Sequence, residues 1–300
     1  MNQSEYVREF LINIGMDLND LQEFLVKIDM LLDKYGKEVE NICTLYRKTC
    51  EMEDGIEICE ELSVKSGVHI YTIRALIVII SSEWLLKKYN EKGYSEEIFW
   101  DTMSDLKCKL VECYQKNKIW GTSTKDWYDL IFKMKVFKLG RLEFGRMTYN
   151  GTKSQKIGDF VLNPGDIVFG VHIPSCGPMP RELRMDSYKK AYNFFEKERG
   201  NKPIIFYCHS WLLYEKNREI FPPHLNMVDF LNDWKIIEST PQDNYISCAR
   251  LFGCDYSGNP EDLPADNTAR RAMVEWLKKG NKTGDGMGIM AFDGEKIIVS

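Results

Sequence analysis

Apolar residues recur at intervals of three and four along the first 135 residues, the spacing of helices with one buried face. The first clear run extends from Leu21 to Leu32, and Gly36 is predicted to end that helix. A second run, at about 66–88, is apolar around much of its circumference and is predicted to lie at the centre of its domain. Similar periods follow to about residue 134. This half of the chain is therefore predicted to be all-helical.

The period changes after about residue 136, where apolar and polar residues begin to alternate as they do in strands. Strands are predicted at about 142–149, 154–162 and 167–173. Turn residues separate them at Asn150-Gly151 and at 163–166, and Asn-Gly is a strong signal for a two-residue hairpin. These three strands are expected to form an antiparallel meander.

Helices and strands then alternate to the end of the chain. The predicted order is a helix to about Arg199, a strand at 203–213, a helix at 224–232, strands at 234–240 and 245–252, a helix at 266–279 and an extended segment at 286–299. Such a mixture predicts an α/β sheet flanked by helices. We therefore expect a helical domain at 1–136, followed by an α/β domain at 137–300.

Composition and charge indicate which kinds of macromolecule the chain does not bind. The chain has 300 residues, a net charge of -5 and a pI near 5.6, so it offers no basic surface for nucleic acid. The longest apolar run, Ala75 to Ile80, is too short to cross a membrane, and the polar N-terminus lacks the apolar core of a signal peptide. We expect a cytoplasmic protein that binds neither nucleic acid nor membranes.

The cysteines and histidines do not form metal-binding motifs. Nine cysteines occur without a C-x-x-C pair, and four histidines occur without an H-x-x-x-H pair. We predict no metal cofactor and no disulfide framework. Most of the cysteines are expected to be buried thiols in a reducing compartment.

The loop at 174–180 suggests a binding site for an anion. An apolar strand ends at Ile173, and a Gly- and Pro-containing loop then leads into a helix predicted to begin at Pro180. A loop of this kind gathers unpaired backbone N–H groups, which bind anions. Arg181 and Arg184 fall in the first turns of this helix, where a cation is unfavourable unless an anion is bound. The alternative is that Gly177 only makes a turn and that both arginines are solvated.

Several motifs resemble a known family. They are Arg141-Leu142-Glu143-Phe144-Gly145-Arg146-Met147, His172-Ile173-Pro174-Ser175, Gly177-Pro178 and Cys208-His209-Ser210-Trp211-Leu212-Leu213. The second half of the chain resembles the GNAT-like C-terminal domain of a bacterial family of acyltransferase domain-containing proteins, in which a helical N-acyltransferase N-terminal domain comes first. The chain departs from the usual pyrophosphate loop of GNAT proteins, because Ser175-Cys176-Gly177-Pro178 stands in its place.

The resemblance implies a GNAT-like, mixed and mostly antiparallel sheet, and an acyl-CoA-dependent N-acyltransferase. Acetyl-CoA or another acyl-CoA would be the co-substrate, and a small-molecule amine the acceptor. The pantetheine arm would enter a gap between the strands at 166–174 and 203–213. The residues implied to bind the cofactor are Val171, Ile173, Ser175, Cys176, Gly177, Arg181 and Arg184.

Three residues near the expected gap are candidates for proton transfer, namely Glu143, His172 and Ser210. Each has a structural alternative: Glu143 as the partner of a neighbouring arginine, and His172 as a hydrogen-bonded strand residue. Two other functions stay open. One is acyl transfer through a covalent intermediate on Cys176, whose thiol lies near a helix N-terminus. The other is a sensor or scaffold that binds CoA or another small molecule without turnover.

The glycine-rich segment 284–288 has the wrong order of elements for a phosphate-binding loop, because a helix precedes it and a strand follows. We expect it to be a flexible connector into the last strand.

Overall fold

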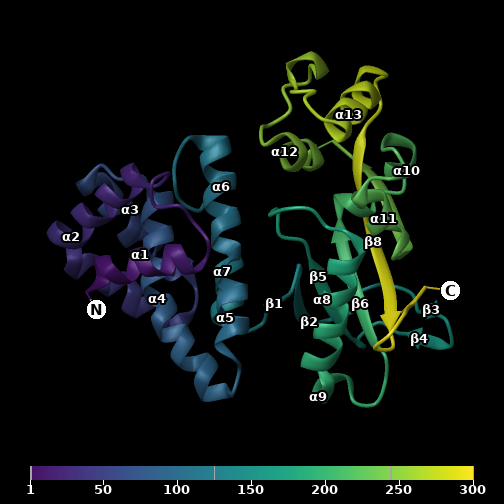
Figure 1. Cartoon of the computed structure of the whole chain (residues 1–300), viewed down its shortest axis with the longest axis horizontal. Helices are drawn as coiled ribbons and strands as arrows, with labels where there is room; N and C mark the ends of the chain where they lie inside the picture. Colours follow the sequence, from purple (N-terminus) through teal and green to yellow (C-terminus); the bar gives the residue numbers. More distant parts are fainter. Residues whose placement is uncertain (1, 125, 244, 300) are drawn as a thin grey trace. The chain divides into compact units, whose positions relative to one another are not determined.

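The computed structural model describes residues 2–124, 126–243 and 245–299, which form two compact units, Met1–Lys138 and Leu139–Ser300 (Figure 1). The first unit is helical. Its elements are α1 (Gln3–Asn13), α2 (Gln22–Thr49), the 3-10 turn η1 (Met52–Gly55), α3 (Ile56–Ser66), α4 (Ile70–Lys92), α5 (Glu96–Met103), α6 (Asp105–Asn117) and α7 (Trp127–Phe132). Every residue of α4 from Thr72 to Ser82 is buried, as the apolar circumference of this segment predicts.

The prediction that Gly36 ends a helix was wrong. Helix α2 continues past it to Thr49, and a single residue, Tyr35, departs from helical geometry with φ -128° and ψ 24°. The reason lies further along the chain, where Val39, Ile42 and Tyr46 are again buried on one face. Their packing holds the second half of the helix, so the glycine marks a kink rather than an end.

The second unit contains the sheet. Its strands are β2 (Leu142–Thr148), β5 (Ile167–His172), β6 (Ile204–Ser210), β8 (Thr283–Phe292) and β7 (Lys235–Gln242), in that spatial order, with β9 (Ile297–Ile298) beside β8 and β1 (Phe137–Leu139) at the junction of the units. All pairs from β2 to β7 are antiparallel except β5 with β6, which is parallel. The predicted mixed, mostly antiparallel sheet flanked by helices is confirmed.

The predicted meander was wrong. Strand β2 pairs directly with β5, and Tyr149 closes the pair through backbone hydrogen bonds with Gly165 and Asp166. The segment between them forms a separate hairpin of β3 (Gln155–Ile157) and β4 (Phe160–Leu162). This hairpin turns at Gly158, whose φ of 54° glycine adopts readily, so the Asn-Gly signal belongs to a loop leading into the hairpin.

Helices and the hairpin cover different parts of the sheet (Figure 1). Helices α8 (Arg181–Phe194) and α9 (Glu196–Arg199) follow β5, and on one face the Tyr188 ring lies 5.5 Å from that of Phe206. On the opposite face Ile157 and Leu162 of the hairpin form a cluster with Val168, Ile289 and Ala291. The two faces therefore have separate apolar cores.

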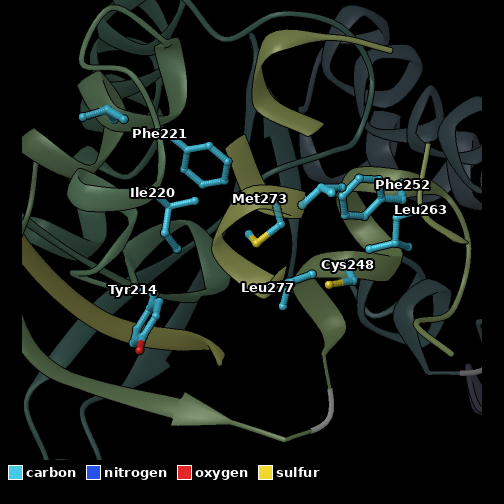
Figure 2. Close-up of a cluster of buried hydrophobic side chains, with 10 residues drawn as sticks. Tyr214, Ile220, Phe221, Cys248, Phe252, Leu263, Met273 and Leu277 are labelled. Carbon is cyan, nitrogen blue, oxygen red and sulfur yellow. The ribbon is translucent and has the colours of Figure 1, made fainter. Parts of the chain in front are cut away.

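A further apolar cluster lies beyond the sheet (Figure 2). It is built by α10 (Asn217–Ile220), α11 (Asn226–Asn232), α12 (Ile246–Phe252), α13 (Thr268–Lys278) and two 3-10 turns, η2 (Trp211–Leu213) and η3 (Pro260–Asp262). The strand predicted at 245–252 was wrong, because this segment is α12. Cys248 and Phe252 lie four residues apart on one helical face and pack in the cluster with Met273 of α13 (Figure 2).

The glycine-rich segment 284–288 lies inside β8 and is not a connector. A Cβ on Gly286 would lie 2.1 Å from the carbonyl oxygen of Leu213, and one on Gly288 would lie 3.0 Å from the Cβ of Trp234. Close packing of η2 against the strand therefore requires glycine. Among the described residues, no helix is long and apolar enough to cross a membrane.

Candidate active site

Strands β5 and β6 are paired over a very short length. Phe169 and Gly170 pair with Phe206 and Tyr207, and within the described residues the register extends no further. The next residues of β5, Val171 and His172, thus have no ladder partner on β6, although β2 pairs with them on the other side. The parallel pair opens toward its carboxyl end, which is also where the loop at 173–180 begins.

Arg141 holds that loop in place through three carbonyl groups. Its Nη2 donates to the carbonyl oxygens of Pro174 at 2.8 Å and Gly177 at 3.1 Å, and its Nε donates to that of Pro178 at 3.1 Å. Burial lowers the pKa of Arg141, and the nearby charge of Glu143 opposes this shift. Because Arg141 binds the carbonyl groups of the loop, these carbonyls are directed toward Arg141, and the N–H groups of the same loop can bind other acceptors. In the described part of the chain, the N–H of Ser175 and of Gly177 donates to no protein atom.

Ser187 on α8 fixes the position of Arg141. Its hydroxyl oxygen accepts hydrogen bonds from the backbone N–H of Arg141 at 2.7 Å and of Leu142 at 3.2 Å, and the hydroxyl donates to the Leu183 carbonyl at 2.9 Å. Gly140 permits this approach: its φ is +77°, and a Cβ would lie 2.9 Å from the Ser187 oxygen. The motif at 140–142 therefore joins the sheet to the helix that follows the loop.

The N-terminus of α8 presents backbone donors beside the loop. Pro180 is its N-cap and makes no side-chain hydrogen bond to the first turn. The first N–H groups of the helix are thus unsatisfied by a cap, and Ser175 and Gly177 nearby are exposed. Loop and helix together can take an anion, as the positive end of a helix dipole favours.

Arg184 does not belong to this anion site, which corrects the prediction for it. The side chain is completely buried and donates to Asp233, to Asp229 and to the Met179 carbonyl. Burial works against its charge, but the hydrogen bonds to Asp233 and Asp229 and the charge of Asp233 raise its pKa above the usual value. Arginines are tolerated in the first turns of α8 because Asp229 of α11 and Asp233, the C-cap of that helix, supply carboxylates.

Arg181 is more accessible. One of its nitrogens donates to Asp233 at 2.8 Å, while the side chain is 55% exposed. It can therefore keep its hydrogen bond to Asp233 and direct its other donors toward solvent. Of the two predicted arginines, this is the one that an anion can reach.

Glu143 and His172 lie directly opposite each other on neighbouring strands. Their side chains share one face of the sheet with Gly145 and Gly170. The space beside Gly170 is filled, because a Cβ there would lie 2.8 Å from the Met147 sulfur and 3.7 Å from His172 Nε2. Glu143 is buried, whereas the His172 side chain is exposed at the opening of the β5–β6 pair. Protein packed around the imidazole lowers the pKa of His172 to about 4, and contact with solvent moderates this effect. His172 is therefore neutral at pH 7.

Ser210 and Cys208 lie on the other face of β6, because neighbouring strand residues alternate. The Ser210 hydroxyl accepts a hydrogen bond from the Leu212 N–H at 3.2 Å and caps η2. Burial raises the pKa of Cys208 well above its usual range, so this thiol does not ionise. The structure thus brings Glu143 and His172 together and places Ser210 on the opposite face.

Sequence reasoning missed His209 and Asp285. His209 follows Cys208 and shares the face of His172, and it lies level with His172 across the opening because Tyr207 pairs with Gly170. Its Nε2 lies 3.5 Å from Asp285 Oδ1 on β8. On the far side of β8, Glu238 of β7 pairs with Met287, the residue that faces His209. We call Glu143, His172, His209 and Glu238 the polar row.

The alternation of side chains along a strand is enough to place His209 and Ser210 on opposite faces. Only the parallel register of β5 with β6 shows that His209 is aligned with His172.

The residues at 2–124, 126–243 and 245–299 contain no group of three or more His, Cys, Asp or Glu side chains that could hold a metal ion.

Comparison with known families decides the assignment. Residues 136–290 match the model of the GNAT-like C-terminal domain, and residues 5–134 match that of the N-acyltransferase N-terminal domain. The chain belongs to this acyltransferase family. The family resemblance of the sequence motifs is confirmed, and the two matches account for nearly the whole chain.

Solved structures agree with this fold. A crystal structure of an acyltransferase mutant in complex with octanoyl-CoA is similar with a TM-score of 0.70 at 18% identity, over 96% of this chain and 88% of that one. An acyltransferase in complex with CoA and 10C-teicoplanin has a TM-score of 0.68 at 18% identity, over 95% and 87% of the two chains. A third, with decanoyl-CoA and teicoplanin, has a TM-score of 0.63 at 17% identity, over 95% and 99%. A search of curated proteins found no match.

Proposed function

We propose that this acyltransferase moves an acyl group from acyl-CoA to the amine of a small-molecule acceptor. One observation carries the proposal: β5 and β6 separate after Gly170 and Tyr207, beside a loop whose carbonyls are held by Arg141. An opening of this kind exposes backbone groups of a strand in the middle of a sheet. Such groups require a hydrogen-bonding partner, and an extended polar chain can supply it.

The proposed roles follow from the placement of the residues. Backbone groups of Val171 and Ile173 lie where the pantetheine arm would run. The N–H groups from Ser175 through Cys176 to Gly177 and the N-terminus of α8 would bind the diphosphate, with Arg181 as the accessible cation. Arg184 supports this site by holding α8 to α11.

The chemistry needs little covalent assistance, because a thioester is already activated and correct positioning supplies much of the rate. A neutral His172 can accept a hydrogen bond from the amine, and Glu143 opposite it can orient that imidazole. Ser210 would have to act from the other face of β6, where its hydroxyl hydrogen is available to a leaving thiolate.

Thermal-shift measurements and turnover assays test the proposal together. CoA, acetyl-CoA, octanoyl-CoA and decanoyl-CoA form the donor panel, because solved relatives were crystallised with the two longer acyl-CoAs. Each donor is incubated with a panel of amines, and release of free thiol and formation of the amide are followed by mass spectrometry. We expect stabilisation by CoA compounds and amide formation with at least one amine.

Two outcomes would contradict this function. Absence of stabilisation by every CoA compound would remove the CoA site, and stabilisation without amide formation across the panel would favour a sensor. Cys176 is disulfide-bonded in this structure, so a covalent route would first require its reduction. The variant C176A, assayed under reducing conditions, tests that route separately: turnover equal to that of the wild type excludes an acyl-Cys176 intermediate. As a matched control, I246A removes an exposed side chain on α12 and should change neither binding nor turnover.

A further inference from the structure

We propose that His209, oriented by Asp285, accepts the proton that the acceptor amine loses during acyl transfer. This inference rests on the proposed N-acyltransferase function and names its proton acceptor. It assigns a catalytic role to His209 and a positioning role to Asp285. The starting point is the place of His209 in the polar row, at the edge of the opening between β5 and β6.

The geometry of the pair suits this role. His209 Nε2 lies 3.5 Å from Asp285 Oδ1, so the carboxylate favours the tautomer with a proton on Nε2. The lone pair of Nδ1 then remains available to take a proton from the amine substrate. The side chain of His209 is 48% exposed and can be reached from solvent, whereas that of Asp285 is 28% exposed.

Both residues sit on rigid elements. Strands β6 and β8 are paired continuously from Ile204 with Phe292 to Ser210 with Gly286. Gln242 of β7 donates to Asp285 Oδ1 at 3.4 Å and helps to fix the carboxylate. A histidine held in this way can meet a substrate without reordering the sheet.

Several titratable groups share the face of the sheet on which His209 lies. They are Asp285 of β8, Tyr207 of its own strand and His172 of β5, with Glu238 of β7 one strand beyond Met287 and Glu143 of β2 one strand beyond His172. Three of these five are carboxylates, and none is a permanent cation. An ammonium or amine acceptor would be attracted to the same surface.

His172 is less suited to hold the proton. The protein packed around it disfavours its charged form, and its direct strand partner is the buried Glu143. His172 can instead accept a hydrogen bond that orients the amine. The two histidines thus have different tasks on the two sides of the opening.

The amine nitrogen forms a bond to the thioester carbonyl carbon, and its proton moves to Nδ1 of His209. The carbon–sulfur bond then breaks, and the sulfur leaves with its electron pair. The proton passes from His209 to the thiolate, directly or through solvent, which regenerates the neutral imidazole.

The test compares the pH profiles of H209Q, D285N and H172Q in the full chain, with a donor and an amine that the wild type uses. Values of kcat/KM are divided by the fraction of acceptor present as free amine, so that titration of the substrate is removed. For H209Q we expect kcat to fall by about 10²- to 10⁴-fold and the acidic limb of the corrected profile to disappear. D285N should retain the limb at a shifted pH, with a smaller loss of kcat.

Controls separate this inference from the proposed function. H224Q replaces an exposed histidine on the loop before α11 and should behave as the wild type. Thermal shifts with the acyl-CoA should be unchanged in H209Q. If H209Q keeps the kcat and the pH profile of the wild type, the role of His209 is overturned, while the acyltransferase function remains in place. If H209Q does not fold, an unshifted limb in D285N decides against the pair.

Discussion

The buried ion pair of Arg184 with Asp233 allows a quantitative test of the structure. Both side chains are almost completely buried, at 0% and 1% exposure, and their atoms are 2.8 Å apart. Substitution R184M keeps a long apolar side chain but leaves Asp233 without this partner. Removal of one member of a buried pair costs about 3–5 kcal/mol. Arg181 and Tyr188 still donate to Asp233, so we expect about 3 kcal/mol, the lower end.

The control R181M removes a half-exposed arginine from the same carboxylate. An exposed ion pair contributes about 0–1 kcal/mol, so this variant should lose much less stability. The double variant R184M/D233L replaces the buried pair with apolar groups. It should lose less than the sum of the two single changes, because neither substitution then leaves a charge buried.

Peptide-resolved alkylation of Cys208 and Cys248 in increasing urea can measure the effect. Both are free, buried thiols of the second unit, so their reactivity reports opening of that unit whether or not the helical unit unfolds. We expect about a hundredfold faster alkylation in R184M at equal urea. A loss in R184M no larger than in R181M would refute the burial of this charge. Weaker acyl-CoA binding at unchanged stability would restore the anion-site prediction for Arg184.

Three further predictions concern packing, hydrogen bonding and pH. G286A should destabilise the second unit by about 2 kcal/mol or more, because its Cβ would meet the Leu213 carbonyl. The control G36A should be neutral or stabilising by about 0.5–1 kcal/mol, because a Cβ there meets no neighbouring atom. Urea unfolding measures the stability of both variants. S187A should cost about 1–3 kcal/mol in the same assay, since two backbone donors lose their acceptor. His172 has a lowered pKa in the folded state, so the unfolded chain binds more protons as the pH falls from about 6.5 to about 4, and stability should decrease over that range. NMR titration should show a neutral imidazole at pH 6, and H172Q should weaken the decrease; a midpoint above 6.5 would contradict the packing around it.

Local patterns in the sequence were enough to predict the type of most elements and the class of fold. Helical spacing in the first half and alternation in the second reflect backbone periods of 3.6 and 2, which act over a few residues. These signals gave the helical unit, the strands that flank the loop at 174–180 and the helix that follows it. The motifs at 141–147 and 172–178 also pointed to the family. Arg141 binds three loop carbonyls with its guanidinium, and Gly177 has a φ of +77° that favours glycine.

Tertiary structure decided which strands pair and which side chains meet. The Asn150-Gly151 pair predicts a hairpin between neighbouring strands, but β2 pairs directly with β5, and Tyr149 closes that pair. Arg184 and Asp233 are 49 residues apart, so no local pattern could show that the arginine is buried in an ion pair. His209 joins His172 only because β5 and β6 are parallel with Gly170 beside Tyr207. Registers and partners of this kind depend on long-range packing, and a periodicity that acts over one or two turns does not contain them.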